Sequence, residues 1–456
     1  MEPVNKNQII NLDIDDLNSE GEGVGRYNGY AVFVKSALPG ENTDVCIVKA
    51  GKDYGYGKLV KINAPSSERR VPDCPVYNVC GGCSLRHVSY AYQLAYKTKR
   101  VSDALARIGG VSGAAVENCV GMEEPFYYRN KAQFPAGVIG GKPGFGFYAK
   151  RSHTLIPVAG CLINHRVNDE IINIITEHII KYNIPVYDET SHAGTIRHIS
   201  TRVGFKTGEI MVCLCVNAKT LPGLYILINK LKKIPGMACV ALNINTKKTN
   251  AVMAGRTRAV WGKGYITDEL SGISFNISPA SFFQVNPIQT EVLYKRAALF
   301  LDVRPGDTVI DAYCGIGTIS LILAKTAKKV YGIESAPLAV SDARNNAEIN
   351  KIENVEFITG KTEDVLNDLY QNGVPPEKLI LNPARKGCDI KTLTSIGEHK
   401  PFKVVYISCN PAALARDVKI LTGFGYAFIK ALPIDCFAYS AHIETVVLLE
   451  KEGYIN

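Results

Sequence analysis

The 456-residue chain contains no apolar run approaching the roughly 18 residues that a membrane-spanning helix needs. Its first residues, MEPVNKNQIINLDIDD, are polar and acidic and lack the basic, then apolar, profile of a secretory signal peptide. No internal repeat or low-complexity tract is visible. These absences argue against a membrane or secreted protein, and we expect a cytoplasmic location.

A cytoplasmic location implies reduced thiols, so the 13 cysteines are not expected to form structural disulfides. Five of them stand in motifs with possible chemistry. The other eight, which include Cys213, Cys215 and Cys239, are expected to pack as small apolar side chains.

Length and composition indicate an ordinary globular protein of two or three domains, with 46% hydrophobic and 21% charged residues. The net charge of +9 favours a polyanionic partner but is modest for this length. A basic surface without any role in nucleic-acid binding would look similar.

Residues 1–62 hold short strand-like stretches, YAVFVKSA and TDVCIVKA, separated by the turn cluster LPGEN. This pattern predicts a small β-barrel. Its last part carries Tyr54 and Tyr56 among four lysines, Lys49, Lys52, Lys58 and Lys61. Lysines neutralise phosphates and tyrosines stack on bases, as a single-stranded RNA surface requires. An exposed lysine-rich edge strand explains the same residues equally well.

The rest of the chain divides into a mixed and a regular part. After a linker at 64–72, residues 63–280 are predicted to form an α+β central domain without a defined topology. Residues 281–456 alternate strand-like stretches (DTVIDAYC, KVYGIE, VEFITG, KLILNP, KVVYISCN) with helices, which predicts a parallel, doubly wound α/β sheet. TVVLLEK adds a further strand.

A nucleoside site is predicted where the first of these strands turns into a helix, at DAYCGIGT. Gly315 and Gly317 let the backbone bend sharply and approach a ligand. Glu334 ends the next strand, where a carboxylate can accept both ribose hydroxyls. The third glycine of the dinucleotide fingerprint is absent, which favours S-adenosylmethionine over NAD.

Cys409, in Ser-Cys-Asn-Pro at another strand end, is a candidate nucleophile. Ligands bind at this edge of open α/β sheets, and a following helix N-terminus at Pro411 is expected to lower the pKa of its thiol. A buried strand-end cysteine with no catalytic role fits the same motif.

Three cysteines spaced as Cys74-x₅-Cys80-x₂-Cys83 predict a metal site in a reducing compartment. Thiolates suit either Zn²⁺ or a [4Fe–4S] cluster, and this spacing leaves the fourth ligand open. The spacing differs from the C-x₃-C-x₂-C of radical S-adenosylmethionine enzymes.

The stretches DAYCGIGT, ISCNPAALARD and AHIETVVLLEK, together with FFQVN (282–286) and YRNK (128–131), resemble the RNA 5-methyluridine methyltransferases over nearly the whole chain. Within that family the chain looks most like the bacterial 23S ribosomal RNA branch, which has an N-terminal TRAM barrel (an OB-like fold) and an iron–sulfur cluster. The resemblance implies a multidomain fold ending in a Rossmann-like methyltransferase domain, and RNA contact by the barrel.

The resemblance also implies roles for single residues. The nucleophile is Cys409, and the general base is Glu444 in His-Ile-Glu. The cofactor-contacting positions are Gln284, Tyr313 and Glu334. The fourth cluster ligand is Cys161. The acid of the family's D-P-P-R segment falls on Asn382, which keeps the shape but loses the charge, so we expect reduced rather than absent activity.

Other functions remain open from the sequence. A non-catalytic RNA-binding paralogue would explain Asn382, and an iron–sulfur redox protein would explain the cysteines. A 5-methylcytidine enzyme is disfavoured because that family has a Pro-Cys pair where this chain has Asn-Pro-Ala. The T-loop of tRNA is the alternative target to 23S ribosomal RNA, and a monomer is the default expectation.

Overall fold

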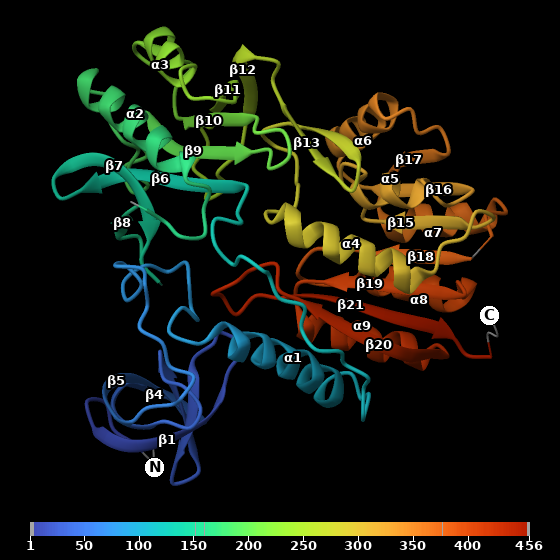
Figure 1. Cartoon of the computed structure of the whole chain (residues 1–456), viewed down its shortest axis with the longest axis horizontal. Helices are drawn as coiled ribbons and strands as arrows, with labels where there is room; N and C mark the ends of the chain where they lie inside the picture. Colours follow the sequence, from blue (N-terminus) through green and yellow to red (C-terminus); the bar gives the residue numbers. More distant parts are fainter. Residues whose placement is uncertain (1–3, 151, 159, 376, 454–456) are drawn as a thin grey trace.

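The computed structural model describes residues 4–150, 152–158, 160–375 and 377–453. Four β-sheets follow one another along the chain. Figure 1 shows the N-terminal barrel in blue, a central sheet in green, and a C-terminal sheet in orange and red with helices on both faces. This multidomain α/β arrangement with an N-terminal barrel confirms the predicted fold class.

The barrel is closed, with strand order β1-β2-β3-β5-β4. Alternate residues of β1, among them Ile10, Leu12 and Ile14, point into its core, as a strand with one buried face requires. The predicted linker folds back on it, since the Arg69 guanidinium donates to the buried Glu41 carboxylate at 2.7 Å. The strands are β1 (Ile9–Leu17), β2 (Gly23–Tyr27), β3 (Tyr30–Lys35), β4 (Asn42–Ala50) and β5 (Tyr54–Ala64).

The central sheet has seven strands in the order β12-β11-β10-β9-β6-β7-β8, and helices α2 and α3 cover one of its faces. The opposite face carries Cys213 and Cys239 and packs toward the C-terminal part. The elements are β6 (Lys131–Ile139), β7 (Lys142–Tyr148), β8 (Leu155–Pro157), α2 (Val167–Lys181), β9 (Ile196–Val203), β10 (Ile210–Val216), α3 (Leu224–Leu231), β11 (Met237–Ile244) and β12 (Arg256–Gly262).

The C-terminal sheet has seven strands in the order β17-β16-β15-β18-β19-β21-β20. The first five are parallel, and β20 and β21 form an antiparallel hairpin at one side. The strands are β15 (Thr308–Ala312), β16 (Lys329–Glu334), β17 (Val355–Thr359), β18 (Lys378–Leu381), β19 (Lys403–Ser408), β20 (Tyr426–Ile434) and β21 (Glu444–Lys451).

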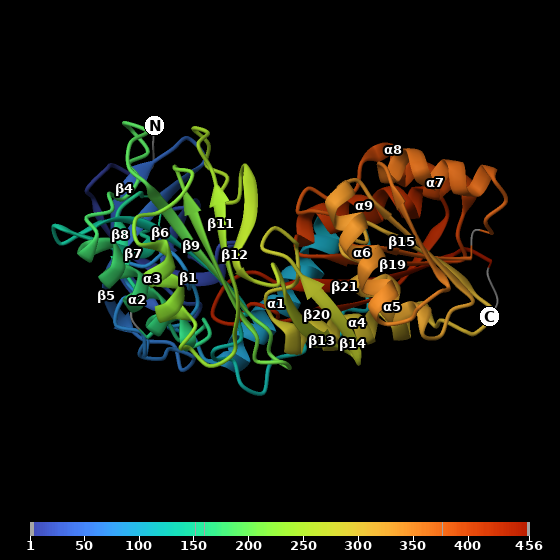
Figure 2. The same ribbon diagram turned by 90° about the horizontal axis from the view of Figure 1, so that it is seen from above.

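Helices cover both faces of this sheet (Figure 2). One face packs against α4 (Pro287–Leu301), α5 (Thr318–Ala324) and α6 (Pro337–Ile349), and the other against α7 (Thr362–Gln371), α8 (Ile390–His399) and α9 (Pro411–Gly423). The predicted doubly wound arrangement is therefore present, with an antiparallel hairpin added.

Two elements from the 63–280 segment pack on the C-terminal sheet. Helix α1 (Tyr90–Arg107) buries Val101 and Leu105 against the same face as α9. The hairpin of β13 (Ile266–Leu270) and β14 (Ile273–Ile277) joins the core on the other face. As a result, α1 reaches the edge of the sheet where the candidate site lies.

Burial of the cysteines follows the sequence prediction closely. Of the eight expected to pack as apolar residues, seven are buried and Cys46 is half-buried in the barrel. All cysteines in the described residues are free thiols. The four in the metal motif and Cys409 are half-buried instead.

Candidate active site

The candidate site is built at one edge of the C-terminal sheet, where five neighbouring strands end or begin. In sheet order these strands contribute Glu334 (β16), Tyr313 (after β15), Asn382 (after β18), Cys409 (after β19) and Glu444 (first residue of β21). Parallel strands present their carboxyl ends at the same edge, and the antiparallel β21 begins there. Residues far apart in the chain are thereby brought side by side.

The glycine turn after β15 has the backbone geometry of a nucleoside site. Tyr313, Gly315 and Gly317 all have positive φ angles, of 75°, 57° and 82°. A Cβ on Gly317 would lie 2.7 Å from the Phe357 ring, so no larger residue fits there. Glu334 accepts hydrogen bonds from the amides of Gly315 at 3.2 Å and Ala336 at 2.8 Å, which holds its carboxylate at the turn.

A second wall of this site comes from FFQVN, which the YRNK motif holds in place. Asn130 donates its amide side chain to the Gln284 carbonyl at 3.0 Å, and its backbone amide to the Val285 carbonyl at 2.8 Å. The Gln284 side chain lies near the buried Tyr294 hydroxyl, which contacts Thr318 at 3.4 Å. Gln284 therefore lies near the start of α5, beside the glycine turn.

Asp311, the last acid before the turn, is fully buried. Ser320 donates to its Oδ2 at 2.5 Å, and its Oδ1 has no hydrogen-bond partner within the described residues. Burial raises its pKa to about 7. The bond to Ser320 ties the strand end to the first turns of α5.

Cys409 lies between β19 and α9, and Asn410 caps this helix by accepting from the Ala412 amide at 3.1 Å. The Arg385 side chain lies close to the Cys409 thiol. Burial and the nearby Glu444 nevertheless raise the pKa of Cys409, and Arg385 opposes this. The lowered pKa predicted for Cys409 from the helix N-terminus is therefore wrong, because desolvation outweighs the favourable charges.

Glu444 is 4% exposed although its position at a strand start resembles that of a surface acid. Burial raises its pKa to about 8, and the Arg385 guanidinium opposes part of this change. Arg385 thus acts electrostatically on both Cys409 and Glu444. In the sequence, Arg385 was recognisable only as the last residue of the Asn-Pro-Ala-Arg segment, and no role was predicted for it.

A polar cleft of about 290 Å³ opens over Cys409. It lies between the barrel, the cysteine-rich segment and the C-terminal sheet edge. Its basic lining residues are Lys35, Arg100, Lys150 and Arg385, with Glu20 and Glu22 as acids. Arg100 and Lys150 had no sequence signal for this role, since the tertiary fold alone brings them to the cleft.

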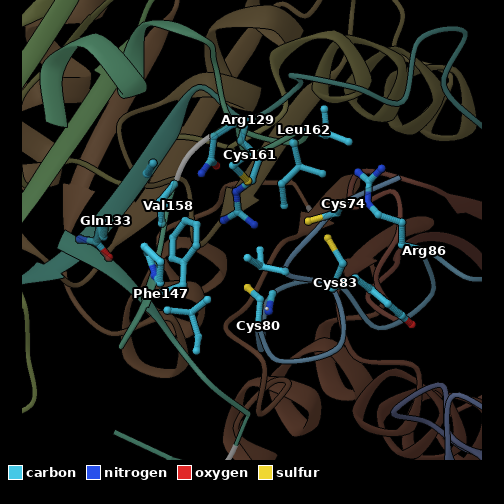
Figure 3. A pocket seen from close by; sticks show the side chains of 18 of the residues that line it. Cys74, Cys80, Cys83, Arg86, Arg129, Gln133, Phe147, Val158, Cys161 and Leu162 are labelled. Carbon is cyan, nitrogen blue, oxygen red and sulfur yellow. Dashed lines mark hydrogen bonds between the residues drawn. The ribbon is translucent and has the colours of Figure 1, made fainter. Parts of the chain in front are cut away.

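The four predicted metal ligands, Cys74, Cys80, Cys83 and Cys161, line a second cavity of about 420 Å³ (Figure 3). Burial first, and then neighbouring thiols, raise the pKa values of Cys80, Cys83 and Cys161. Within the part of the chain that is described, no three Cys, His, Asp or Glu side chains converge closely enough for a single metal ion.

Comparisons with known proteins agree with this geometry. The tRNA (uracil-5-)-methyltransferase family model matches residues 242–452, and the TRAM domain model matches residues 3–60. An uncharacterized RNA methyltransferase of Clostridium tetani is 44% identical over 99% of this chain and 98% of its own. One of Halalkalibacterium halodurans is 46% identical over 99% of both chains.

The chain belongs to the RNA uracil-5 methyltransferase family. Its fold matches the crystal structure of Pyrococcus abyssi tRNA (uracil-54, C5)-methyltransferase in complex with S-adenosyl-L-homocysteine. The TM-score is 0.77 at 26% identity, covering 96% of this chain and 100% of the other. This methyltransferase therefore has RNA as its substrate, S-adenosylmethionine as its methyl donor and a TRAM domain at its N-terminus.

The TRAM barrel of this methyltransferase carries the predicted aromatic and basic residues on its surface. The rings of Tyr54 and Tyr56 contact that of Phe33, with centroids 5.3 and 5.7 Å away. Tyr54 is 47% exposed, and the four lysines are exposed. No described helix has both the length and the apolar character that crossing a bilayer demands.

Proposed function

We propose that this methyltransferase modifies carbon 5 of a uridine in 23S ribosomal RNA, and that Cys409 forms a covalent adduct at carbon 6. The observation that carries the proposal is the meeting of Cys409 and Glu444 at the edge that also holds the glycine turn, with Arg385 acting on both. A nucleophile, a base and a cofactor turn are the parts that this reaction needs.

Carbon 5 of uracil is too weak a nucleophile to accept a methyl group unaided. The Cys409 thiolate adds to carbon 6, and the electron pair of the C5–C6 double bond moves toward the carbonyl at carbon 4, which gives an enolate. Carbon 5 then bonds to the methyl carbon, the methyl–sulfur bond of the sulfonium breaks, and S-adenosylhomocysteine is released.

Glu444 completes the reaction as the base. Carbon 5 now carries both a proton and the methyl group, and the Glu444 carboxylate removes the proton. The electrons of that C–H bond restore the C5–C6 double bond and expel Cys409 as a thiolate. Burial disfavours both anions in the free protein, so Arg385 has the role of stabilising each when it forms.

The residues of the turn and its neighbours fit S-adenosylmethionine. Glu334 would accept the ribose hydroxyls, because its carboxylate is held at a strand end beside the glycine turn. Asn382 follows β18, which lies between β15 and β19 in the sheet, so its neutral side chain is proposed to contact the cofactor or the uracil. The proposed cofactor-binding set is Gln284, Tyr313, Gly315, Gly317, Glu334 and Asn382.

The cleft over Cys409 supports entry of an unstacked uridine. Its basic residues can bind backbone phosphates, and the barrel surface around Tyr54 and Phe33 can stack on single-stranded bases. A stacked base is out of reach of a recessed thiol, so the target uridine must flip out or lie in a loop.

We propose that Cys74, Cys80, Cys83 and Cys161 hold a [4Fe–4S] cluster. All four thiols line one cavity, and cysteine thiolates are the ligands that hold [4Fe–4S] clusters. Gly82 donates its amide to the Cys80 sulfur at 3.4 Å, a contact that favours thiolate ligands. The cluster would link the cysteine-rich segment to the central domain. Cys80 and Cys83 also line the cleft over Cys409. The cluster would therefore lie close to the bound RNA and have a structural role.

The target and the covalent step are tested with unmodified transcripts of 23S ribosomal RNA and of tRNA, tritiated S-adenosylmethionine and mapping of 5-methyluridine. We expect label in 23S ribosomal RNA, and none with Cys409→Ser. Label confined to tRNA would support the second candidate, which the similarity to the Pyrococcus enzyme favours. Undiminished transfer by Cys409→Ser would refute the adduct.

Two further expectations accompany this function. An enzyme that acts on cellular RNA with free thiols should work in the cytoplasm. We expect a monomer, and size-exclusion chromatography with light scattering measures this directly.

A further inference from the structure

The segment 435–443, called the strap here, connects β20 to β21 and ends at Glu444. Its residues Ser440, Ala441 and His442 line the cleft beside Cys409. The path of the strap therefore affects both the cleft wall and the approach to the base. Side chains of helix α1, which is not part of this sheet, bind the strap.

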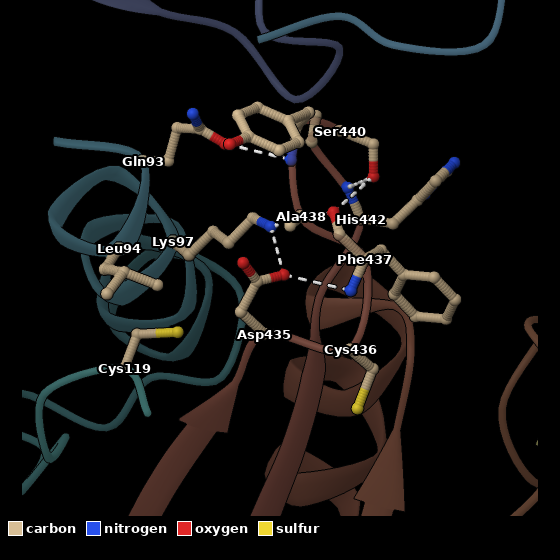
Figure 4. A network of polar contacts seen from close by, with 12 residues as sticks. Gln93, Leu94, Lys97, Cys119, Asp435, Cys436, Phe437, Ala438, Ser440 and His442 are labelled. Carbon is tan, nitrogen blue, oxygen red and sulfur yellow. Dashed lines mark hydrogen bonds and ion pairs between the residues drawn. The ribbon is translucent and has the colours of Figure 1, made fainter. Parts of the chain in front are cut away.

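A fully buried ion pair holds the first part of the strap (Figure 4). The Lys97 ammonium on α1 lies 2.6 Å from Asp435 Oδ1, and neither side chain is exposed to solvent. Lys97 also donates to the Phe437 carbonyl at 3.2 Å, while the Phe437 amide donates to Asp435 Oδ1 at 2.9 Å. The pair thus closes a small ring of hydrogen bonds with the strap backbone.

Asp435 is also bound from the side of α1. The Tyr90 hydroxyl donates to Asp435 Oδ2 at 2.9 Å. Two donors on α1 and one in the strap therefore use the oxygens of a single carboxylate. Such a group fixes distance and direction, which an apolar contact of the same size would not do.

Further side chains on the same face of α1 bind later residues of the strap. The Gln93 carbonyl oxygen accepts from the Tyr439 amide at 3.0 Å, and Arg100 donates to the Ala441 carbonyl. Gln93, Lys97 and Arg100 are four and three residues apart, so they lie along one side of the helix. Helix α1 therefore holds the strap at residues 435, 437, 439 and 441.

The anchored end of the strap adjoins the base directly. Ile434, which precedes Asp435, is the cross-strand partner of Glu444. Burial, and then the nearby carboxylates of Glu444 and Asp435, raise the pKa of Cys436, so this thiol lies close to both. The Cys436 carbonyl accepts from Asn286 at 3.2 Å, which links the same point to the segment holding Gln284.

We propose that Lys97 and Asp435 are positioning residues for proton removal: their ion pair holds the strap so that Glu444 faces carbon 5 of the uridine bound to Cys409. This inference rests on the proposed function. A buried ion pair is a weak source of stability, because desolvation offsets its attraction, and a role in holding one conformation accounts for it better.

The reaction itself supplies a readout that a purely structural role would not change. Methyl transfer precedes proton removal, so a misplaced base leaves methylated RNA attached to Cys409. A loss of folded protein lowers the amounts of adduct and product together. A positioning defect raises the adduct while it lowers the product.

The test compares Lys97→Met, Asp435→Asn and the double variant as full-length holoenzyme. The probe is unmodified 23S ribosomal RNA transcript, or the tRNA transcript if that is the RNA methylated. Adduct is resolved on denaturing gels with methyl-labelled cofactor, and kcat and KM are measured on released product. Arg107→Met is the matched control, since Arg107 is an exposed cation on the same helix, 3.8 Å from Asp103.

For Lys97→Met we expect kcat to fall about tenfold with little change in KM, and the adduct-to-product ratio to rise by a similar factor, since the base is displaced rather than removed. Arg107→Met should match wild type. If Lys97→Met does not fold, Tyr90→Phe removes one donor to Asp435 and should raise the ratio less strongly.

An unchanged adduct-to-product ratio in the folded variants would overturn the inference, as would an equal rise in Arg107→Met. Glu444→Gln separates this failure from failure of the mechanism. If Glu444→Gln accumulates adduct and the Lys97 and Asp435 variants do not, only the positioning role is refuted. If no variant and no wild-type reaction forms adduct, the proposed covalent mechanism fails.

Discussion

Replacing Glu444 by Gln removes a buried carboxyl group with almost no change of shape, and we expect the variant to be inactive yet more stable at high pH. The side chain is 4% exposed, and burial raises its pKa from an ordinary 4.5 to about 8. At about 1.4 kcal/mol per pH unit, this change corresponds to about 5 kcal/mol of unfolding free energy.

The direction of the change in unfolding free energy with pH depends on whether the folded or the unfolded chain releases the Glu444 proton first. Below pH 4.5 the carboxyl group is protonated in both the folded and the unfolded chain. Between pH 4.5 and about 8 the unfolded chain loses the proton while the folded protein keeps it, so wild-type stability falls as pH rises. Above about pH 8 the folded protein must bury the anion. Gln cannot ionise, so the variant avoids this loss.

The difference between variant and wild type should therefore grow across this window, to at most about 5 kcal/mol. The chain has several domains, so we would follow hydrogen exchange in β19 to β21 as well as the thermal midpoint. For a domain of this size, about 5 kcal/mol corresponds to a midpoint shift of roughly 10 °C or more.

Cys409→Ser is the matched control, because it should be equally inactive but retains Glu444. Its stability relative to wild type should not grow over the same pH window. A Glu444→Gln variant whose stability difference from wild type stays constant from pH 5 to pH 9 would refute the reasoning. So would a variant less stable than wild type at pH 8.5.

Arg385→Met should move the rise of kcat with pH to higher pH, because Arg385 lowers the pKa of both Cys409 and Glu444; an unmoved pH profile would contradict this role. Asn382→Asp should speed methyl transfer by roughly tenfold if a charge at this position helps the cofactor or the flipped uracil, and equal single-turnover rates would rule that out. Tyr54→Ala should weaken RNA binding about tenfold or more, measured by fluorescence anisotropy at fixed salt, and leave kcat at saturating RNA unchanged; unweakened binding would exclude stacking at this surface.

The sequence predicted the elements of the C-terminal sheet well because each carries its own local signal. The short apolar strands and the glycine turn at 315–317 can each be recognised from a stretch of only a few residues. Glu334 was placed correctly at a strand end for the same reason. The second antiparallel strand, β20, was not predicted, although its sequence YAFIKALPI is strand-like.

Helix α1 shows where this local reasoning stops. It lies in the segment that was predicted as α+β, and its place on the C-terminal sheet was not predicted. Three polar residues of α1, Gln93, Lys97 and Arg100, would look like an ordinary solvated side of a helix. Gln93 and Lys97 are buried because a strap more than 300 residues later packs on them.

The prediction of a lowered pKa for Cys409 was wrong for the same reason. A helix N-terminus is visible in the sequence, and it favours a thiolate. Desolvation and the carboxylate of Glu444 act in the opposite direction, and both come from contacts that only the folded chain makes. The net direction of the pKa change of Cys409 could therefore not be predicted from the motif.

The sequence by itself determined the types of element, the family and the chemical groups available for the reaction, since these depend on residue identity and short spacings. The tertiary structure alone decided which of those groups meet. It placed Cys409 beside Glu444 and Arg385, and Lys97 against Asp435, by bringing separate strands and helices to one sheet edge. The physical reason is that burial and electrostatics depend on every neighbour in space, whereas motifs record only neighbours along the chain.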